Sequence, residues 1–505
     1  MTAAATLPPS SAAAAGPADL AYRSAGELTK MLVDKEISAR ELVDAAIARI
    51  EALDGKFNAV VVRDFDRARA AALEADAALA NGTEPGQKKP LLGLPITVKE
   101  QYAVAGLPTS WGDPKHKDWR PDFDALTVQR LKNAGAIVLG KTNVPINLTD
   151  WQSYNEVYGT TNNPWDVTRT PGGSSGGSAA ALAAGYVALE LGSDIGGSLR
   201  APAHYCGAFS HKPTLDLVPQ RGSIPPRLPN TLIRGDLAVV GPMARSAADL
   251  ALELDVLAGP DEWLEGIAYK FALPPPRHDK LADFRVLVID DHPLFPTASS
   301  IRTALGDLAG KLERPGARVV RTSPALPDLA ATTRLYMELL TAFFSVDVPP
   351  EARERLAAAA KALSPDDQSL AACRTRGFTI SHSDWVQKSR MRGGVSARWR
   401  ALFREFDVVL CPAMPTAAFP HDHTSPQRER QLDVDGRKLP YLDQIVWASM
   451  ATLTGLPATV APLGRTPEGL PFGVQIIGPY LEDRTPITFA GLLEREFGGF
   501  TPPNL

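Results

Sequence analysis

The sequence predicts an α/β protein whose strands and helices are stacked in layers. Apolar runs at residues 91–98 and 136–139 are typical of buried strands, and residues 124–133 between them have the pattern of a helix. The order strand, helix, strand is characteristic of layered α/β folds. The chain has 505 residues, of which 44% are hydrophobic, so it can bury a large core.

The N-terminal region predicts helices that serve as scaffold. Apolar residues recur at helical spacing after Ser24, and Ser38 is followed three residues later by Glu41, which is the pattern of a capping box. An alanine-rich third helix is expected at residues 64–80. Residues 1–22 are rich in Ala, Pro and Ser and are expected to form a mobile tail.

The remaining residues, 23–505, are expected to form a single domain, because they contain no internal repeat, heptad run or long linker. The run at residues 91–98 ends at Lys99 and is expected to be a buried strand at a sheet edge, and residues 160–178 are expected to be loop. Later strands are predicted at residues 284–289, 407–410, 458–462 and 472–477. Helices are predicted at residues 179–184, 300–312 and 486–497 and over most of 326–406. Residues 421–437 are expected to form an exposed polar loop.

Charge and cysteine content limit the class of protein. The 53 Lys and Arg residues nearly balance the 57 Asp and Glu residues, so nothing favours nucleic acid as a partner. No uncharged apolar run reaches about 20 residues, and the N-terminus lacks the pattern of a secretory signal, so we expect neither a membrane span nor export. Three sparse cysteines (Cys206, Cys373 and Cys411) are typical of free thiols in a reducing cytoplasm.

Two clusters of Gly and Ser carry the clearest functional signal. They occupy residues 172–178 and 192–198, and glycine-rich turns of this kind let backbone N–H groups converge on an anion. A phosphate-binding loop would end in Gly-Lys-Ser/Thr, which neither cluster has. A nucleophile elbow would place Ser174 after a strand, but loop-forming residues precede it. The third interpretation is a hydrolase that uses serines without a histidine.

These motifs resemble the amidase signature family. Its Gly-Gly-Ser-Ser-Gly-Gly loop and its Asp-Ile-Gly-Gly-Ser-x-Arg-x-Pro-Ala segment both occur in order in this chain. The matching pieces lie at residues 93–99, 135–136, 140–143, 158–159, 163–164, 172–177, 194–203, 206–207, 212–214, 455–458 and 469–475. The similarity spans roughly residues 24–497 and is weakest at about 264–406. It implies an α/β/α layered fold with a large mixed sheet, and a helical, substrate-capping variable region at 264–406.

The resemblance also implies a triad. By motif position Ser198 is the nucleophile, Ser174 is a serine on a cis peptide bond that relays the proton, and Lys99 is the base. A serine hydroxyl needs such a neighbouring base. The ordinary lysine pKa is ~10.4, and burial can lower it by up to ~3–5 units. Lys99 follows an apolar run, which is a suitable setting for such a lowered pKa.

Further roles are expected around the triad. The backbone N–H groups of Ile195, Gly196, Gly197 and Ser198 are the candidate oxyanion donors. Supporting roles are expected for Ser175, beside the relay, and for Asp194 and Arg200, as a buried pair that shapes the loop. Leu148, Thr149 and Trp151 could wall the substrate pocket, although plain packing explains them equally well. In the variable region, an apolar pocket could be capped by Tyr336, Met337, Phe343, Phe344 and Trp385, although an apolar stripe of this kind is more often core.

No metal or cofactor is expected. Neither His204 nor His211 has metal-ligand spacing around it, and His421 and His423 form only a weak pair in a polar loop. Glu100 follows Lys99 where the family usually has Asp. Because the side chain of Glu is longer, the partners of the Glu100 carboxylate are not predicted.

Three functions remain open at this point. The first is a stand-alone amidase that forms an acyl-enzyme on Ser198 and acts on a small amide, anilide or carbamate, as an aryl acylamidase or urethanase, with ester side activity. The second is the glutaminase subunit of a tRNA-dependent amidotransferase, and the third is a non-catalytic protein on the same fold. No motif encodes the oligomeric state, and a homodimer stays open.

Overall fold

The computed structural model describes residues 20–82, 89–228, 230–231 and 234–505. The predicted tail therefore lies outside the described residues, except for its last three. Of these, Leu20 is buried against the core, so the described chain begins in contact with it.

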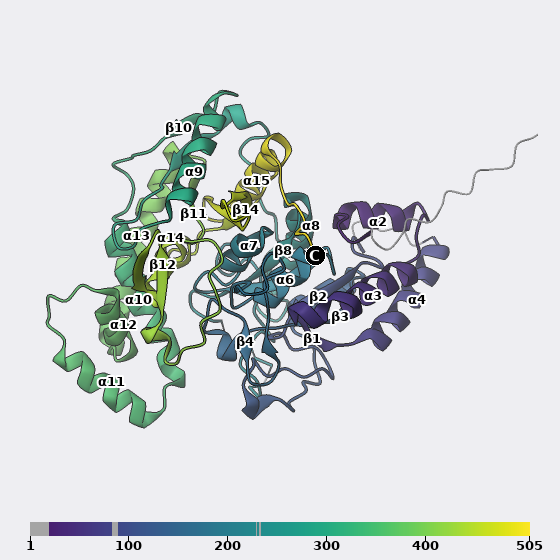
Figure 1. Ribbon diagram of the computed structural model, residues 1–505, viewed down its shortest axis with the longest axis horizontal. Coiled ribbons are helices and arrows are strands. Elements are labelled where there is room, and N and C mark those ends of the chain that lie inside the picture. The colour runs from purple at the N-terminus through teal and green to yellow at the C-terminus, as the bar shows by residue number, and fades with distance from the viewer. Residues whose placement is uncertain (1–19, 83–88, 229, 232–233) are drawn as a thin grey trace, which may run out of the picture.

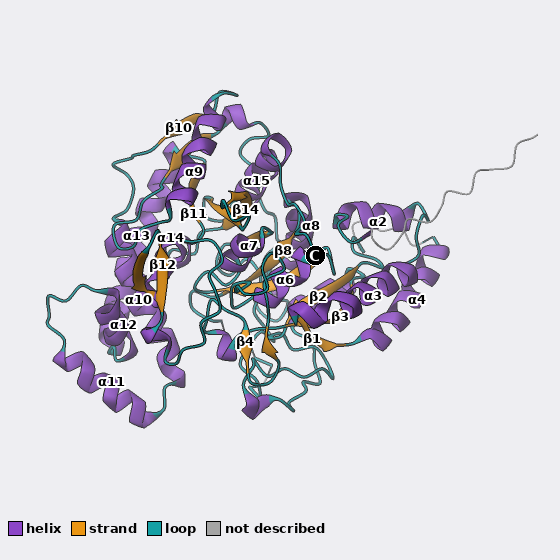
Figure 2. Cartoon of the chain, viewed as in Figure 1, coloured by secondary structure: helices purple, strands orange, loops and turns teal. Residues whose placement is uncertain are grey.

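Eleven strands form one mixed sheet through the molecule (Figures 1 and 2). They are β1 Val60–Arg63, β2 Pro95–Lys99, β3 Ile137–Thr142, β6 Leu189–Asp194, β7 Phe209–Lys212, β8 Val239–Ala244, β9 Arg285–Val288, β10 Arg318–Val320, β11 Val408–Pro412, β14 Ala458–Arg465 and β15 Pro471–Ile477. Their order is β1-β3-β2-β6-β8-β7-β14-β15-β11-β9-β10. β2 pairs in parallel with β3 and β6, and β9 with β10 and β11, whereas the other neighbours are antiparallel.

Helices flank the sheet (Figure 2). They are α2 Ala25–Val33, α3 Ala39–Phe57, α4 Phe65–Ala80, α5 Leu126–Asn133, α6 Gly176–Ala183, α7 Arg200–Cys206, α8 Ala247–Leu257, α9 Ser299–Glu313, α10 Leu329–Phe344, α11 Pro350–Ala362, α12 Leu370–Phe378, α13 His382–Glu405, α14 Val446–Leu453 and α15 Arg484–Phe497. Successive residues of a strand face opposite sides, yet Thr97 and Val98 are both fully buried, so both faces of the sheet are covered. The predicted layered α/β fold with a large mixed sheet is confirmed.

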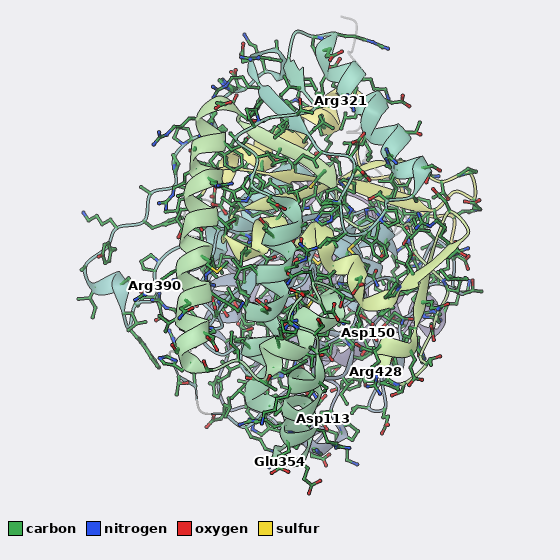
Figure 3. All side chains as sticks on the ribbon, turned by 90° about the vertical axis from the view of Figure 1, so that its left-hand side faces the viewer. Asp113, Asp150, Arg321, Glu354, Arg390 and Arg428 are labelled. Carbon is green, nitrogen blue, oxygen red and sulfur yellow. The ribbon has the colours of Figure 1, made fainter. Side chains whose placement is uncertain are left out.

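Most predicted elements appear within a few residues of their expected bounds. Ser38 accepts a hydrogen bond from the Glu41 N–H while the Glu41 carboxylate accepts one from the Ser38 N–H, so the predicted capping box is confirmed. The mostly helical region at residues 326–406 forms α10 to α13, which lie on the side of the molecule that faces the viewer in Figure 3. Within the described chain, every helix is too short or too polar to cross a bilayer.

Three local predictions are wrong. β2 is an interior strand between β3 and β6, not an edge. Helix α6 begins three residues earlier than predicted, at Gly176 inside the first Gly/Ser cluster. The predicted loop at 421–437 contains β12 Gln431–Val434, which pairs with β13 Arg437–Pro440. Leu432 and Val434 alternate with exposed residues and are buried, and an Asp-Gly turn follows them, which is a hairpin signal in the sequence.

The buried apolar residues form two clusters that meet next to the second Gly/Ser cluster. One cluster contains Leu191 and Leu199 together with the N-terminal helices and most of the sheet. The other contains Trp151, Ala201 and Tyr336 together with α14 and buried residues of α10, α12 and α13. The turn between β6 and α7 therefore lies between two separately packed bodies of core.

Candidate active site

Lys99 ends the interior strand β2 and is completely buried. Its ammonium Nζ donates to Ser174 Oγ over 2.6 Å and to Ser193 Oγ over 2.9 Å. Burial lowers the pKa of Lys99 from its ordinary value to about 7, and the charges of Asp194 and Glu190 oppose that change. A lysine of this kind is largely unprotonated just above neutral pH and can accept a proton.

Ser174 lies in the first Gly/Ser cluster, directly before α6. The peptide bond between Gly173 and Ser174 is cis, the conformation implied for the middle serine of the triad. Gly173 leaves no room for a side chain, because a Cβ there would stand 2.3 Å from the Asp150 carbonyl oxygen. The cluster thus holds Ser174 on a backbone that approaches another segment closely.

Ser198 lies in the turn that links β6 to α7, and the residue is 7% exposed. The Ser175 N–H donates to the Ser198 carbonyl over 3.2 Å, so the two Gly/Ser clusters contact each other. Within the described chain, no hydrogen bond joins the hydroxyls of Ser174 and Ser198. Substrate entry or a small side-chain rotation would therefore have to complete a relay between them.

Asp194 organises this turn. Its carboxylate accepts from the N–H groups of Gly197 and Leu199 over 2.9 and 3.0 Å, and it forms a two-pronged ion pair with the Arg200 guanidinium. Burial opposes the charged carboxylate, but Arg200 and the Gly197 N–H hold the Asp194 pKa below its usual range. The pair is buried, as the expected loop-shaping role requires.

Fewer backbone N–H groups of the turn at residues 195–198 are free to bind an oxyanion than the sequence predicted. The Gly197 N–H is taken by Asp194. Over the described residues, the N–H groups of Ile195, Gly196 and Ser198 have no acceptor within the protein. The candidate oxyanion donors therefore narrow to these three, because a carboxylate already satisfies the fourth.

Two polar residues near Lys99 were missed by the sequence analysis. Ser193 Oγ accepts from Lys99 and donates to Gln101 Oε1 over 2.5 Å, and Gln101 Nε2 donates to Ser223 Oγ over 2.6 Å. Both could have been noticed, since Gln101 is two residues beyond Lys99 and Ser193 lies inside the second cluster. Ser175 contacts the backbone of Ser193 through long hydrogen bonds of 3.4 Å, so it touches this group only weakly.

The carboxylate of Glu100 points away from the triad. It accepts from the N–H groups of Ser110 and Trp111 over 2.6 and 2.9 Å and from the Tyr158 hydroxyl over 3.0 Å. Glu100 therefore fixes the turn at residues 110–111, and its longer side chain is fully accommodated there.

The three predicted pocket residues are placed differently from one another. Trp151 is buried, and its indole N–H donates to the Gly196 carbonyl over 2.9 Å. Leu148 is half-buried, and Thr149 is exposed with its hydroxyl bonded to the Ile146 carbonyl. Trp151 is thus the one of the three that hydrogen-bonds to the turn at residues 195–198.

The histidines singled out in the sequence have partners of their own. His204 bonds to backbone atoms of Thr416 and Gly473, His211 to Asp483 and Thr459, and His423 stacks on Tyr154. Over the residues that the structure describes, no three His, Cys, Asp or Glu side chains are grouped so that they could hold a metal ion.

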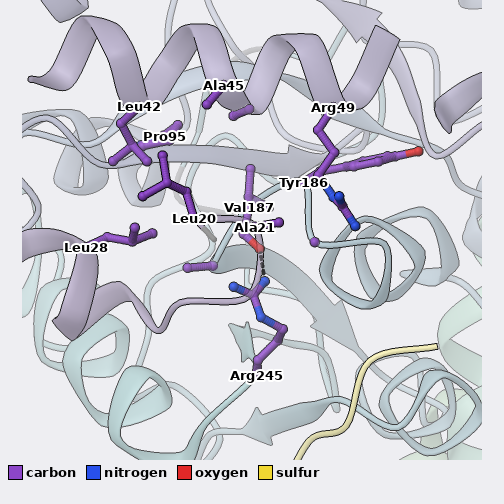
Figure 4. Close-up of a pocket in the computed structure, with 13 residues that line it drawn as sticks. Leu20, Ala21, Leu28, Leu42, Ala45, Arg49, Pro95, Tyr186, Val187 and Arg245 are labelled. Carbon is purple, nitrogen blue, oxygen red and sulfur yellow. Dashed lines mark hydrogen bonds between the residues drawn. The ribbon is translucent and has the colours of Figure 1, made fainter. Parts of the chain in front are cut away.

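A small cavity, which none of the three triad residues lines, lies between α2, α3 and the segment 185–188 that precedes β6 (Figure 4). Its volume of about 20 Å³ holds no more than a water molecule. Arg245 lines it and donates to the Val187 carbonyl, a contact that Figure 4 shows, and to the Arg23 carbonyl. This cavity is a gap under the N-terminal segment and is unsuited to an organic substrate.

Several known proteins are similar to this chain in sequence. A family model described as Amidase matches residues 41–486. AmiB2 of Mycobacterium tuberculosis, a putative amidase by its description, is 34% identical over 95% of this chain and 97% of its own length. A glutamyl-tRNA(Gln) amidotransferase subunit of an Anaeromyxobacter species is 32% identical over 93% of this chain and 95% of its own.

Solved structures share the fold. A chain from a complex that reveals the evolutionary origins of an s-triazine catabolic enzyme is 28% identical, with a TM-score of 0.77 over 94% of this chain and 98% of its own. A bacterial aryl acylamidase has a TM-score of 0.79 over 95% of this chain and 97% of its own; at 23% identity it shows the fold alone. Together the matches define a hydrolase that acts on carbon–nitrogen bonds. The chain belongs to the amidase signature family.

Proposed function

We propose that this amidase cleaves its substrate through an acyl-enzyme on Ser198, with Ser174 as proton relay and Lys99 as base. The observation that carries the proposal is the 2.6 Å hydrogen bond between Lys99 Nζ and Ser174 Oγ, at a lysine whose pKa burial lowers to about 7. The hydrogen bond from the Ser175 N–H to the Ser198 carbonyl supports it, because Ser175 directly follows Ser174.

In the first half-reaction, Ser198 Oγ attacks the substrate carbonyl carbon, and its proton passes through Ser174 to the neutral Lys99 amine. The free N–H groups of Ile195, Gly196 and Ser198 stabilise the oxyanion. The tetrahedral intermediate then collapses, the carbon–nitrogen bond breaks, and the leaving nitrogen takes the proton back along the same path. Water hydrolyses the ester in the second half-reaction and restores Ser198.

The side chains that pack over the turn favour an uncharged acyl group. A Cβ on Gly196 would stand 3.6 Å from both Ile445 and the Tyr336 hydroxyl. One on Gly197 would stand 3.5 Å from Ala448 and 3.8 Å from the Trp151 indole nitrogen. None of these neighbours is charged, so we propose a small amide, anilide or carbamate as substrate. The expected location is the cytoplasm, and the three buried thiols are compatible with it.

The test compares the wild type with Ser198→Ala on 4-nitroacetanilide and ethyl N-(4-nitrophenyl)carbamate, each of which releases 4-nitroaniline when its carbon–nitrogen bond breaks. We expect hydrolysis by the wild type and its loss in the variant, and labelling of Ser198 alone by a fluorophosphonate. Ser210→Ala is the matched control, because Ser210 is a buried strand serine whose hydroxyl has no partner among the described residues. Equal turnover by the wild type and Ser198→Ala would overturn the proposal.

The relationship to amidotransferase subunits motivates a second candidate, glutamine hydrolysis within a larger complex. Release of ammonia from glutamine, with no turnover of the anilide or carbamate, would favour that function. A protein that neither hydrolyses these compounds nor reacts with the fluorophosphonate would instead be a non-catalytic member of the family.

A further inference from the structure

Two side chains from distant parts of the chain hold the carbonyls of the turn at residues 195–198. The Tyr336 hydroxyl, from α10, donates to the Ile195 carbonyl over 2.6 Å. The Trp151 indole N–H donates to the next carbonyl, that of Gly196, over 2.9 Å. Both side chains are buried, so water does not compete strongly for these hydrogen bonds.

Each hydrogen bond also fixes an N–H group. In a trans peptide the C=O and the N–H point in opposite directions, and the Ile195 carbonyl shares its peptide unit with the Gly196 N–H. By holding the Ile195 carbonyl, Tyr336 turns the Gly196 N–H to the other side, where it has no acceptor among the described residues. In the same way, Trp151 directs the Gly197 N–H towards Asp194.

The turn needs such support because two of its residues are glycines. Gly197 has a φ of +97°, and glycine peptides rotate more freely than others. A rotated peptide between residues 195 and 196 would point its carbonyl where the N–H now points. Asp194 fixes the Gly197 and Leu199 N–H groups but does not contact the peptide between 195 and 196.

The two donors are themselves held by the C-terminal half of the chain. Trp151 packs edge-on against Tyr441, whose hydroxyl donates to the Asp150 carboxylate over 2.6 Å. The helix of Tyr336 is joined to α14 through a 2.8 Å hydrogen bond between the hydroxyls of Thr333 and Ser449. Tyr336 and Trp151 therefore have little freedom to move away from the turn.

We propose that Tyr336 and Trp151 are positioning residues for the turn at residues 195–198. Tyr336 holds the Gly196 N–H towards the developing oxyanion, and Trp151 holds the next peptide with its N–H on Asp194, so that the turn keeps its shape. This inference rests on the proposed function, because it assumes that the turn receives the oxyanion. It assigns Tyr336 a function in catalysis beyond packing, and it replaces the pocket-wall role expected for Trp151 by support of the oxyanion site.

The test uses full-length protein, 4-nitroacetanilide as substrate and the variants Tyr336→Phe and Trp151→Phe. Each removes one donor and keeps an aromatic ring. The matched control is Thr341→Val, which removes a buried hydroxyl on the same helix that bonds only to carbonyls of that helix. Phenylboronic acid serves as a probe that forms a tetrahedral adduct with an active serine.

We expect kcat to fall roughly tenfold in each aromatic variant, the effect of about one hydrogen bond. That is less than the ~100-fold or larger loss typical of removing an oxyanion donor itself. KM and the melting temperature should change little. The affinity for phenylboronic acid should fall by the same factor as kcat/KM, and Thr341→Val should behave as wild type.

An unchanged kcat in both variants would overturn the inference, as would a raised KM at constant kcat, which is the signature of a pocket wall. These outcomes presuppose a wild type that hydrolyses the anilide and loses activity as Ser198→Ala. If the wild type is inactive on it, the rate of fluorophosphonate labelling at Ser198 replaces kcat. Failure of Ser198 to react at all would overturn the proposed function itself.

Discussion

At the scale of single residues, the arrangement around Lys99 determines where its lone pair points. A neutral amine has two N–H bonds and one lone pair. Ser193 Oγ gives its own proton to Gln101 and so can only accept from Lys99. In the neutral amine one N–H of Lys99 is thereby tied to Ser193. The lone pair can then accept the proton of Ser174, to which the protonated ammonium donates instead. Under the proposed function, Ser193 and Gln101 would thus orient Lys99 for its role as base.

The first prediction concerns the pH dependence of hydrolysis. Because burial lowers the Lys99 pKa to about 7, the fraction of neutral base rises from pH 6 to pH 8. We expect kcat/KM for 4-nitroacetanilide to follow that rise and to level off above pH 8. The rate of fluorophosphonate labelling of Ser198 should show the same dependence. A flat profile from pH 6 to 9 with chemistry rate-limiting would contradict the role of Lys99 as base.

The second prediction concerns stability and the same lysine. The folded-state pKa of Lys99 lies below its value in the unfolded chain, so between about pH 7 and 10 the unfolded state binds more protons and stability rises with pH. Lowering a pKa by one unit on folding corresponds to about 1.4 kcal/mol. Lys99→Met should therefore be inactive but harder to unfold than wild type at pH 6, with a smaller gain at pH 9.

Urea unfolding at both pH values measures this difference. Lys361→Met, on the exposed side of α11, is the control and should leave the free energy of unfolding within about 0.5 kcal/mol of wild type. A Lys99→Met variant that is less stable than wild type at pH 6 would show that contacts of the ammonium group outweigh its burial.

Sequence reasoning reached the residues of the triad through ordered motifs, and the structure brings Lys99 and Ser174 into direct contact. It did not find that Tyr336 contacts Ile195, 141 positions away in the chain. A hydrogen bond of that kind depends on how α10 packs over the turn, and neither periodicity nor a local motif encodes it. Trp151 was found as a neighbour of the site, but its hydrogen bond to Gly196 was not.

At the scale of elements, the step from β6 through the turn to α7 depends on one carboxylate. Asp194 ends the strand, accepts from two N–H groups of the turn and pairs with Arg200 at the start of the helix. The sequence predicted this pair because both residues belong to one motif. The start of α6 was predicted less well, because a Gly-rich segment is typical of loops. The position of β2 in the sheet was also predicted wrongly, because a short apolar run does not reveal which strands lie beside it.

The third prediction tests this element. Asp194→Asn leaves a buried guanidinium without its counter-charge, and breaking a buried pair from one side costs about 3–5 kcal/mol. We expect that loss in the free energy of unfolding, together with loss of most hydrolytic activity. The control is Asp255→Asn, because Asp255 pairs with Arg484 at the surface, where such pairs contribute about 0–1 kcal/mol. Similar costs in both variants would contradict the structural role of Asp194.

At the scale of the whole molecule, the candidate active site lies where the two apolar clusters meet. The buried guanidinium of Arg430 joins two segments of the chain next to this site. Arg430 donates to the Asp150 carboxylate, the Tyr154 hydroxyl and the Thr424 carbonyl, each over 2.6 Å. These contacts connect the C-terminal segment around residues 424–430 to the segment that carries Trp151. The motifs that carry the family resemblance contain neither Arg430 nor Tyr441, so the sequence offered no signal for this connection.

The last prediction follows from that connection. Arg430→Met keeps much of the side-chain volume but leaves the buried Asp150 carboxylate with the Tyr441 hydroxyl alone, so unfolding should become easier by about 3 kcal/mol. Because Trp151 adjoins Asp150 and supports the turn at residues 195–198, kcat should fall with little change in KM. Arg428→Met is the matched control two residues away, since Arg428 lies at the surface (Figure 3), and it should match wild type in both measurements. An Arg430→Met variant that is destabilised but fully active would show that this buried group holds the two segments together without tuning the site.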